Sequence, residues 1–231
     1  MTGFFNYCTI YLSRTCIQSL LFEVALLYRS TYLFHANNIQ NGLIEDGELI
    51  AVANQPLDSL DDFKKQGIAC FGDGIELIES GLMDAVIVAL PTALHAPVGI
   101  RALKAGLHLM MEKPLACHKA EGERILAAKQ RDDQIAALMM NQRTHPCYVQ
   151  IKQWIDDGAV GELQRVSWIM TNWFRPEIYY QSSPWRATWK GEGGGVLMNQ
   201  CPHNIDVLQW LVGMPSSILA NCSFGTYNNI D

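Results

Sequence analysis

Between residues 48 and 140, short continuous apolar runs alternate with segments in which apolar residues recur at helical spacing. The strongest run is DAVIVAL at residues 84–90. Runs of about four to eight apolar residues are typical of parallel strands that are covered on both faces. Strands that alternate with helices indicate right-handed βαβ units and a parallel sheet. From this pattern we predict strands at residues 48–54, 69–71, 84–90, 107–111 and 135–140.

Helices are predicted between these strands, and glycines mark where three of them end. Gly67, Gly81 and Gly106 follow the helical patterns, and glycine is favoured after a helix because it adopts positive φ without a steric penalty. Asp58 or Ser59 is the expected N-terminal cap of one helix. The predicted helices cover residues 35–41 (the end of a helix), 58–67, 73–80, 97–105 and 119–131.

Beyond residue 141 the pattern changes, and we predict a domain boundary near residue 142. Residues 148–157 carry apolar side chains at helical spacing, and residues 163–171 alternate in the manner of a half-buried strand. A helix is predicted at residues 196–211, and a strand at residues 218–227. The chain is thereby divided into an atypical segment 1–34, a domain 35–142 and a partial domain 143–231.

Residues 1–34 are rich in aromatic, β-branched and leucine side chains. Arg14 and Glu23 interrupt the apolar run, whereas a signal peptide needs a basic start, an unbroken apolar core and a small-residue cleavage site. A membrane span needs about 20 apolar residues, and no such run exists here. We therefore expect neither a signal peptide nor a membrane anchor, and we expect this segment to be poorly packed.

The composition argues against several classes of protein. The chain has 231 residues, of which 49% are hydrophobic and 17% are charged, as in ordinary globular proteins. A net charge of -6 without a basic cluster argues against a nucleic-acid partner. The seven cysteines form no C-x-x-C pair, which favours reduced thiols in a cytoplasmic protein over a disulfide framework or a zinc site.

Two candidate functional stretches follow the predicted strands. Glu112 and Lys113 come directly after the strand at 107–111, and Pro91, Thr92 and His95 follow the strand at 84–90. Ligands of open parallel sheets bind beyond the carboxyl ends of the strands. We therefore expect Lys113 to lie at the mouth of a pocket, and we expect the loop after residue 90 to form one wall of a cofactor site. The alternatives are a solvated surface lysine and a helix start capped by Thr92.

A third candidate lies in the glycine-dense stretch that precedes the helix at 196–211. If this stretch is helical, Asn199, His203 and Asp206 lie on one face, and Pro202 introduces a kink. Histidine suits proton transfer near neutrality because its ordinary pKa is about 6.5. The alternative is a structural histidine. A metal site formed by His203, Asp206 and Cys201 lacks a familiar zinc spacing, so we expect no metal.

Aromatic side chains cluster with two arginines between residues 173 and 190. The arginines are Arg175 and Arg186. Stacking rings and fixed guanidinium groups would suit a sugar or polyol, and a buried core or an interface is the alternative. The aromatic residues are Trp173, Phe174, Tyr179, Tyr180, Trp185 and Trp189.

Two separated motifs resemble those of one known family. They are DAVIVALPTALHAPVGIRALKAGLHLMMEKPLA at 84–116 and GEGGGVLMNQCPHNIDVLQWLVG at 191–213. Together they resemble the Gfo/Idh/MocA family of NAD(P)-dependent oxidoreductases, over a match from about residue 35 to the end. The resemblance implies an α/β protein, with a Rossmann-type parallel sheet followed by part of an α/β domain with a mostly antiparallel sheet. It also implies hydride exchange between NAD or NADP and a sugar or cyclitol, and a possible homo-oligomer formed through the C-terminal sheet.

The resemblance assigns roles to individual residues. Lys113 is the lysine of the EKP motif, which contacts the cofactor and the substrate oxygen, and His203 is the proton-transferring histidine. Pro91, Thr92, His95 and Glu112 are assigned to cofactor binding. Asn199, Asp206 and Arg186 are assigned to the substrate.

The sequence departs from the family pattern at three places. Asn199 stands where many members have aspartate, and Asn54 and Gln55 replace the acidic residue that holds the adenosine ribose. No G-x-G-x-x-G precedes His35, although that glycine-rich turn lets the backbone approach a pyrophosphate. We therefore expect a family member with a disturbed amino terminus and a truncated carboxyl terminus. The alternative is a catalytically silent relative that binds a small ligand or a partner.

Overall fold

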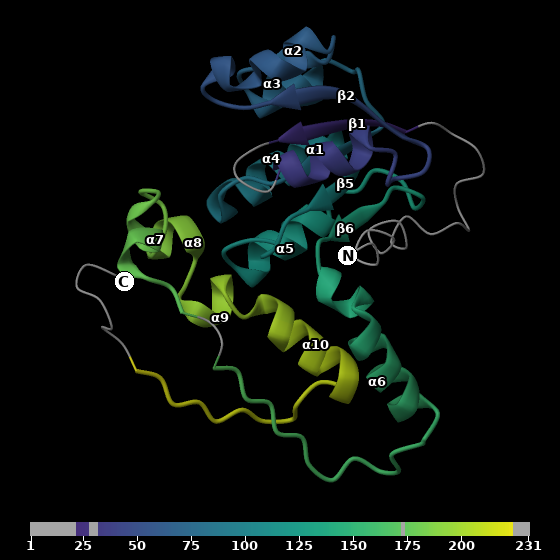
Figure 1. Cartoon of the computed structure of the whole chain (residues 1–231), viewed down its shortest axis with the longest axis vertical. Coiled ribbons are helices and arrows are strands. Elements are labelled where there is room, and N and C mark those ends of the chain that lie inside the picture. The colour runs from purple at the N-terminus through teal and green to yellow at the C-terminus, as the bar shows by residue number, and fades with distance from the viewer. Residues whose placement is uncertain (1–21, 28–31, 172–173, 224–231) are drawn as a thin grey trace. The chain divides into compact units, whose positions relative to one another are not determined.

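The computed structural model of the chain describes residues 22–27, 32–171 and 174–223, with side chains from residue 33 onward. The chain divides into two compact units, Met1–Met139 and Met140–Asp231. Figure 1 labels helices and strands of both units where there is room.

The first unit is built on a six-stranded parallel sheet with the strand order β3-β2-β1-β4-β5-β6. This is the doubly wound order, which reverses direction between β1 and β4, and it confirms the predicted Rossmann-type parallel sheet. The strands are β1 (Phe22–Leu27), β2 (Gly47–Ala53), β3 (Ala69–Phe71), β4 (Ala85–Val88), β5 (His108–Met111) and β6 (Ala136–Leu138).

Two apolar clusters explain why the strand sequences are continuously apolar. Val86 and Val88 of β4 belong to one cluster with residues of the later helices, such as Leu103 and Ile125. Ile87 of β4 lies in a second cluster with residues of the earlier helices. Alternate strand residues therefore enter different clusters. The helices are α1 (Tyr32–Gln40), η2 (Leu57–Leu60), α2 (Asp61–Lys65), α3 (Gly74–Glu79), η3 (Thr92–Leu94), α4 (His95–Lys104) and α5 (Lys119–Leu126).

The helix ends agree with the prediction in part. Gly67, Gly81 and Gly106 have positive φ angles after their helices, as predicted. The cap predicted at Asp58 or Ser59 is wrong, and so is the alternative in which Thr92 caps a helix. The Ser59 hydroxyl donates to the Pro56 carbonyl at 2.6 Å and accepts from Asn54 Nδ2 at 2.6 Å. Thr92 opens the 3₁₀ turn η3, and no side chain caps α4. Both expected caps lie within 3₁₀ turns that precede the helices.

The predicted amino-terminal segment 1–34 falls mostly outside the described residues. Its described strand β1 pairs in parallel with both β2 and β4. Residues 22–27 therefore belong to the sheet of the first unit, which begins before the predicted boundary at residue 35. The connection from β1 to α1, residues 28–31, contains no glycine and also lies outside the described residues. Within the described part of the chain, none of the helices combines the length and apolar character that crossing a membrane requires.

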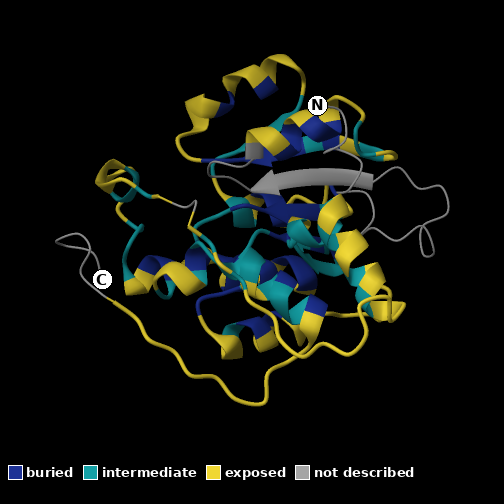
Figure 2. Ribbon diagram, turned by 60° about the horizontal axis from the view of Figure 1, so that its bottom comes forward, coloured by how far each residue is buried: buried dark blue, intermediate teal, exposed yellow. Residues whose placement is uncertain are grey.

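The described residues of the second unit form short helices and extended segments. The predicted strands at 163–171 and 218–227 are not found in its described residues, and residues 224–231 lie outside the description. Residues 218–223 are exposed throughout, as Figure 2 shows for the extended segments of this unit. An alternating sequence forms a strand only beside a neighbour that accepts its backbone hydrogen bonds. The helices are η4 (Asn141–Thr144), α6 (Pro146–Asp156), α7 (Glu177–Gln181), α8 (Trp189–Glu192), α9 (Val196–Asn199) and α10 (Pro202–Val212).

Candidate functional site

The carboxyl ends of β4 and β5 lie side by side at one edge of the parallel sheet. Val88 of β4 is paired with Met111 of β5, and the Glu112 amide donates to the Val88 carbonyl at 2.9 Å. The chain that follows β4 contains Pro91 and Thr92, and the chain that follows β5 contains Lys113. The fold therefore places these sequence-predicted residues in the loops at the edge where parallel α/β sheets bind ligands.

Glu112 ties α1 to this edge. Its Oε1 lies 3.0 Å from His35 Nε2, and its Oε2 accepts from the Lys113 amide at 3.2 Å. Burial alone would raise the pKa of Glu112, but the hydrogen bond and charge of His35 and the amide and charge of Lys113 hold this pKa below its usual value. The carboxylate is thus ionised and bound to groups of the protein itself. This arrangement favours a role for Glu112 in positioning Lys113 over the predicted direct contact with the cofactor.

His95 is buried beneath the same loops and is only 1% exposed. Its Nδ1 lies 2.7 Å from the Pro114 carbonyl oxygen, and its Nε2 lies 2.8 Å from the Leu90 carbonyl oxygen. Burial lowers the pKa of His95, although the two carbonyls oppose that effect. The side chain holds the loop after β4 against the loop after β5. Such burial favours a positioning role over the predicted contact with a cofactor.

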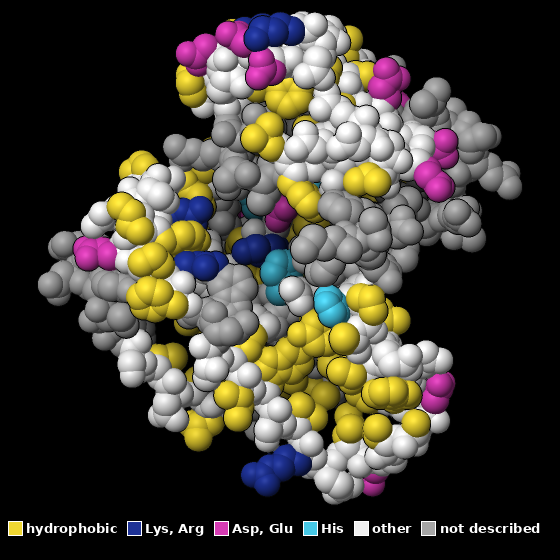
Figure 3. Space-filling view, viewed as in Figure 1, with side chains coloured by type: hydrophobic (Ala, Val, Ile, Leu, Met, Phe, Trp, Pro, Cys, Tyr) yellow, Lys and Arg dark blue, Asp and Glu magenta, His cyan; other side chains and the backbone are white. Residues whose placement is uncertain are grey.

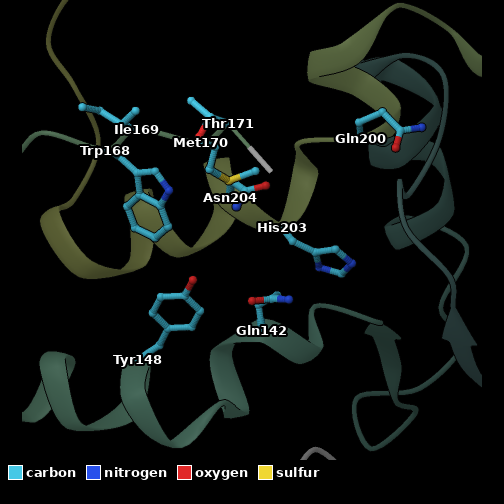
Figure 4. A pocket seen from close by; sticks show the side chains of 9 residues that line it. All are labelled: Gln142, Tyr148, Trp168, Ile169, Met170, Thr171, Gln200, His203 and Asn204. Atoms are coloured by element: carbon cyan, nitrogen blue, oxygen red, sulfur yellow. The ribbon is translucent and has the colours of Figure 1, made fainter. Parts of the chain in front are cut away.

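The second unit contains a pocket of about 530 Å3. His203 lines it from the first turn of α10, together with Asn204. Figure 4 shows Gln142 and Tyr148 on one side of the cavity and Trp168 on another. These three residues were not among the sequence-predicted site residues. Tyr148 was predicted to belong to an amphipathic helix and Trp168 to a half-buried strand. The complete lining is Gln142, Tyr148, residues 168–171, Gln200, His203 and Asn204.

The helix predicted at 196–211 is broken in two. Helix α9 ends at Asn199, and α10 begins at Pro202, whose ring has no N–H to donate. The kink predicted at Pro202 is therefore confirmed, as a complete break. The prediction that Asn199, His203 and Asp206 share one helical face is wrong, because Asn199 lies on a different helix. Asn199 is buried, and its Oδ1 accepts from Gln200 Nε2 at 2.8 Å.

Asp206 lies one helical turn after His203 and is paired with Arg143 of η4. Arg143 Nε donates to Asp206 Oδ2 at 2.7 Å, and Arg143 Nη2 donates to Asp206 Oδ1 at 2.6 Å. The guanidinium also lies over the Trp210 ring, with Cζ 5.8 Å from the ring centroid. This bidentate pair holds α10 against η4, so the geometry favours positioning of His203 over the substrate role predicted for Asp206. Arg143 was not predicted because its partner is distant in the sequence.

Arg186 belongs to a polar network that reaches the pocket. Its Nη1 donates to the Tyr179 hydroxyl at 2.5 Å and lies 3.7 Å from Glu192 Oε1. Arg175 also lies over the Tyr179 ring, with Cζ 4.8 Å from the ring centroid. Gln200 Nε2 donates to the Tyr179 hydroxyl at 3.1 Å, and Gln200 itself lines the pocket. Arg186 is therefore connected to the pocket wall through Tyr179 and Gln200.

Metal coordination has no support in the described part of the chain. No group of three or more His, Cys, Asp or Glu side chains is arranged there to hold a metal ion.

Two family models match the chain. The model described as "Oxidoreductase family, NAD-binding Rossmann fold" matches residues 29–141. The model described as "GFO/IDH/MocA C-terminal domain" matches residues 148–230. Both motifs of the resemblance lie within these matched regions.

Two relatives are identical to this chain at 28% and 29% of the aligned residues. Oxidoreductase P35 of Formosa agariphila is 28% identical over 171 residues, covering 71% of this chain and 52% of that protein. The scyllo-inositol 2-dehydrogenase (NADP(+)) IolW of Bacillus subtilis is 29% identical over 146 residues, covering 63% of this chain and 39% of that protein. The chain thus spans about half the length, or less, of these two relatives.

A solved structure shares the fold. It is the WlbA dehydrogenase of Bordetella pertussis in complex with NADH and UDP-GlcNAcA, with a TM-score of 0.71 and 26% sequence identity. The similarity covers 83% of this chain and 60% of that one. Together, the parallel sheet, the two family-model matches and these relatives show that the chain belongs to the Gfo/Idh/MocA family of oxidoreductases.

Proposed function

We propose that this protein transfers a hydride between NAD or NADP and a hydroxyl or ketone group of a sugar or cyclitol. The observation that carries the proposal is His203, which lies on the wall of a pocket lined by polar and aromatic side chains. A histidine in such a place suits proton transfer to or from a hydroxyl. Membership of an oxidoreductase family and the inositol dehydrogenase among the relatives support the same reaction class.

The first unit fits one end of a dinucleotide better than the other. Loops at the carboxyl edge of its sheet contain Pro91, Thr92 and Lys113, as expected near the nicotinamide. At the adenosine end, Asn54 donates to Ser59 Oγ at 2.6 Å and supplies no carboxylate for the ribose. The glycine-free connection 28–31 departs from the family's phosphate turn. We therefore propose NAD or NADP as the cofactor without preference, and weaker binding than a glycine-rich turn provides.

The residues of this chain supply the proton and charge chemistry. When bound, the nicotinamide accepts or donates the hydride. Neutral His203 accepts the hydroxyl proton during oxidation, and the Lys113 ammonium stabilises the negative charge that develops on the oxygen. Glu112 and His95 hold the loop that contains Lys113, and Asp206 holds the helix that contains His203. Asn199 and Arg186 are proposed to face the substrate side, with Arg186 acting through Tyr179 and Gln200.

The binding test for this proposal is a titration of the purified chain with NADH and with NADPH, followed by nicotinamide fluorescence. An increase or blue shift of that fluorescence is expected. If neither nucleotide binds at millimolar concentration, the oxidoreductase proposal fails for this chain, and the ligand-binding alternative is favoured.

The catalytic test compares Lys113→Ala and His203→Ala with the unmodified chain. Each substitution is expected to lower turnover by at least ~100-fold, the usual loss when an acid–base or electrostatic group is removed. Lys119→Ala is a matched control, because this lysine side chain is 91% exposed at the start of α5. Unchanged turnover in either test variant would refute the role assigned to that residue.

A further inference from the structure

The walls of the His203 pocket contain no permanently charged side chain. Among the described residues that line it, none is Asp, Glu, Lys or Arg. Three of the lining residues, Gln142, Gln200 and Asn204, have amide side chains, and amides both donate and accept hydrogen bonds. A surface of this kind matches hydroxyl groups, which also donate and accept.

Two aromatic rings supply an apolar surface in the same pocket. The rings of Tyr148 and Trp168 are stacked, with centroids 5.8 Å apart and an interplanar angle of 26°. Figure 4 shows Tyr148 rising from α6 toward Trp168, which comes from the extended segment before residue 172. The C–H face of a saturated ring packs against aromatic carbon, while its hydroxyl groups point outward to polar partners.

Gln200 is fixed in place on the pocket wall. Its Nε2 donates to the Tyr179 hydroxyl and to Asn199 Oδ1, and its Oε1 accepts from Arg175 Nε at 3.0 Å. An amide held at both ends keeps its orientation, so the ordering cost of binding a ligand against it is small.

The arginines near the pocket are engaged with protein groups. Arg143 is paired with Asp206, and Arg186 bonds Tyr179 and lies near Glu192. Arg175 bonds Gln200, and none of the three lines the pocket. A carboxylate or phosphate placed against these walls would lose its hydration without meeting a charged partner there, which is costly.

Resting on the function proposed above, we propose that this pocket selects an uncharged polyhydroxylated ring, a neutral hexose or a cyclitol. Tyr148 and Trp168 are its stacking surface, and Gln142 and Asn204 bind its hydroxyl groups. Both Nε2 protons of Gln200 are engaged within the protein, so Gln200 accepts from a further hydroxyl through its Oε1. The same walls discriminate against rings that carry a carboxylate or phosphate substituent.

The binding experiment uses saturation-transfer difference NMR on the full chain, so it does not depend on turnover. The probes are myo-inositol and D-glucose, with D-glucuronate as the matched anion, because it differs from glucose in having a carboxylate at C6. Strong transfer to the ring C–H protons of a neutral probe is expected, with at least ~10-fold weaker affinity for D-glucuronate. Trp168→Ala is expected to weaken neutral-probe binding by about tenfold. Trp154→Ala is the control, since this α6 side chain is 50% exposed and outside the pocket.

The outcomes separate this inference from the proposed function. Neutral-probe binding that is lost in Trp168→Ala but kept in Trp154→Ala supports the inference, even if no nucleotide is reduced and the proposed function fails. Equal or tighter binding of D-glucuronate overturns the inference, even if the chain is an active oxidoreductase. It is also overturned if neither neutral probe binds, or if both tryptophan variants bind like the unmodified chain.

Discussion

The two units are stabilised by different interactions. In the first unit, two apolar clusters include fully buried side chains such as Leu60, Leu77, Leu103 and Ile125. In the second unit, the described apolar side chains that are buried are Val207 and Leu211 of α10. Several apolar residues of α6 and α10 are exposed, and hydrophobic side chains gather over these helices in Figure 3. They are Val149, Ile151 and Trp154 of α6 and Ile205 and Val212 of α10.

Polar contacts take the place of an apolar core in the described part of the second unit. The Arg143–Asp206 pair and the network through Tyr179 and Gln200 hold the elements around His203. Apolar packing is non-directional and adapts to small changes, whereas hydrogen bonds weaken steeply with misalignment. We therefore expect the second unit to tolerate small structural changes less well than the first.

The largest expected difference comes from a matched pair of glycines. A Cβ on Gly191, in the second unit, would overlap the backbone carbonyl oxygen of Trp185. A Cβ on Gly99, in α4 of the first unit, would lie 2.6 Å from Met111 Cε, the flexible end of a side chain. Gly191→Ala should therefore lower the free energy of unfolding by about 3 kcal/mol. Gly99→Ala should change it by less than about 1 kcal/mol, because methionine repacks and alanine favours a helix.

Tryptophan fluorescence measures unfolding of the second unit separately, since all six tryptophans lie between residues 154 and 210. Denaturant unfolding followed by this fluorescence reports the second unit, and far-UV circular dichroism reports both units. Equal destabilisation by the two substitutions would contradict the proposed difference in tolerance.

The first unit was largely predictable from the sequence because its signals are local. The continuous run at 84–90 becomes a strand because Val86 and Ile87 enter different apolar clusters, so both faces are covered. Gly81 and Gly106 end helices through their own φ preference. The cap predicted at Asp58 or Ser59 and the alternative cap at Thr92 both failed, because 3₁₀ turns precede these helices and sequence composition does not distinguish the two helix types.

The polar contacts of the site were not predictable because their partners are distant in the chain. His35 and Glu112 are separated by 77 positions, and Arg143 and Asp206 by 63. The alternation at 163–171 predicted a strand, but no neighbouring strand pairs with it among the described residues. His203 was predicted as a candidate from the glycine-dense stretch before it and from the ordinary pKa of histidine, and the motif that it shares with a family then assigned its role.

A smaller effect is expected where the second unit depends on one ion pair. Arg143→Met removes the bidentate partner of Asp206, whose side chain is 14% exposed, so the second unit should lose about 2 kcal/mol of stability. Arg143→Lys keeps the charge but not the paired geometry, and should lose about half as much. Because Asp206 lies one turn after His203, kcat should fall in the same order while KM changes less.

A double-mutant cycle identifies the pair as the cause. Asp206→Asn alone should resemble Arg143→Met, and the double variant should be less destabilised than the sum of the two. Strictly additive losses would show that the two side chains act independently, and a kcat unchanged in Arg143→Met would remove its positioning role.

The smallest expected effect is the pH dependence of the first unit, and its sign follows from His95. Burial lowers the pKa of His95 below the ordinary value of 6.5, so the unfolded chain binds a proton at a higher pH than the folded chain. The contribution of His95 to the free energy of unfolding is therefore fully present above about pH 6.5. It declines as the pH falls toward the lowered pKa, by at most about 1.4 kcal/mol per pH unit. The pKa of Glu112 is also lowered, but the stability it contributes is lost only near and below its ordinary value of 4.5.

Urea unfolding followed by far-UV circular dichroism between pH 7.5 and 5.5 isolates the histidine effect. His95→Gln should be less stable than the unmodified chain at pH 7.5, because a glutamine amide does not reproduce both carbonyl contacts. It should also show a shallower decline toward pH 5.5. Burial lowers the pKa of His108 as well, so part of the slope should remain in His95→Gln and disappear only in the double variant with His108→Gln. An unchanged slope in His95→Gln would mean that His95 takes up protons equally in the folded and unfolded chains, and a steeper decline would mean that His95 is protonated in the folded chain and donates to both carbonyls. The buried histidine of the first unit would then be held by charge-assisted hydrogen bonds, and the contrast between an apolar first unit and a polar second unit would be weaker at this edge of the sheet.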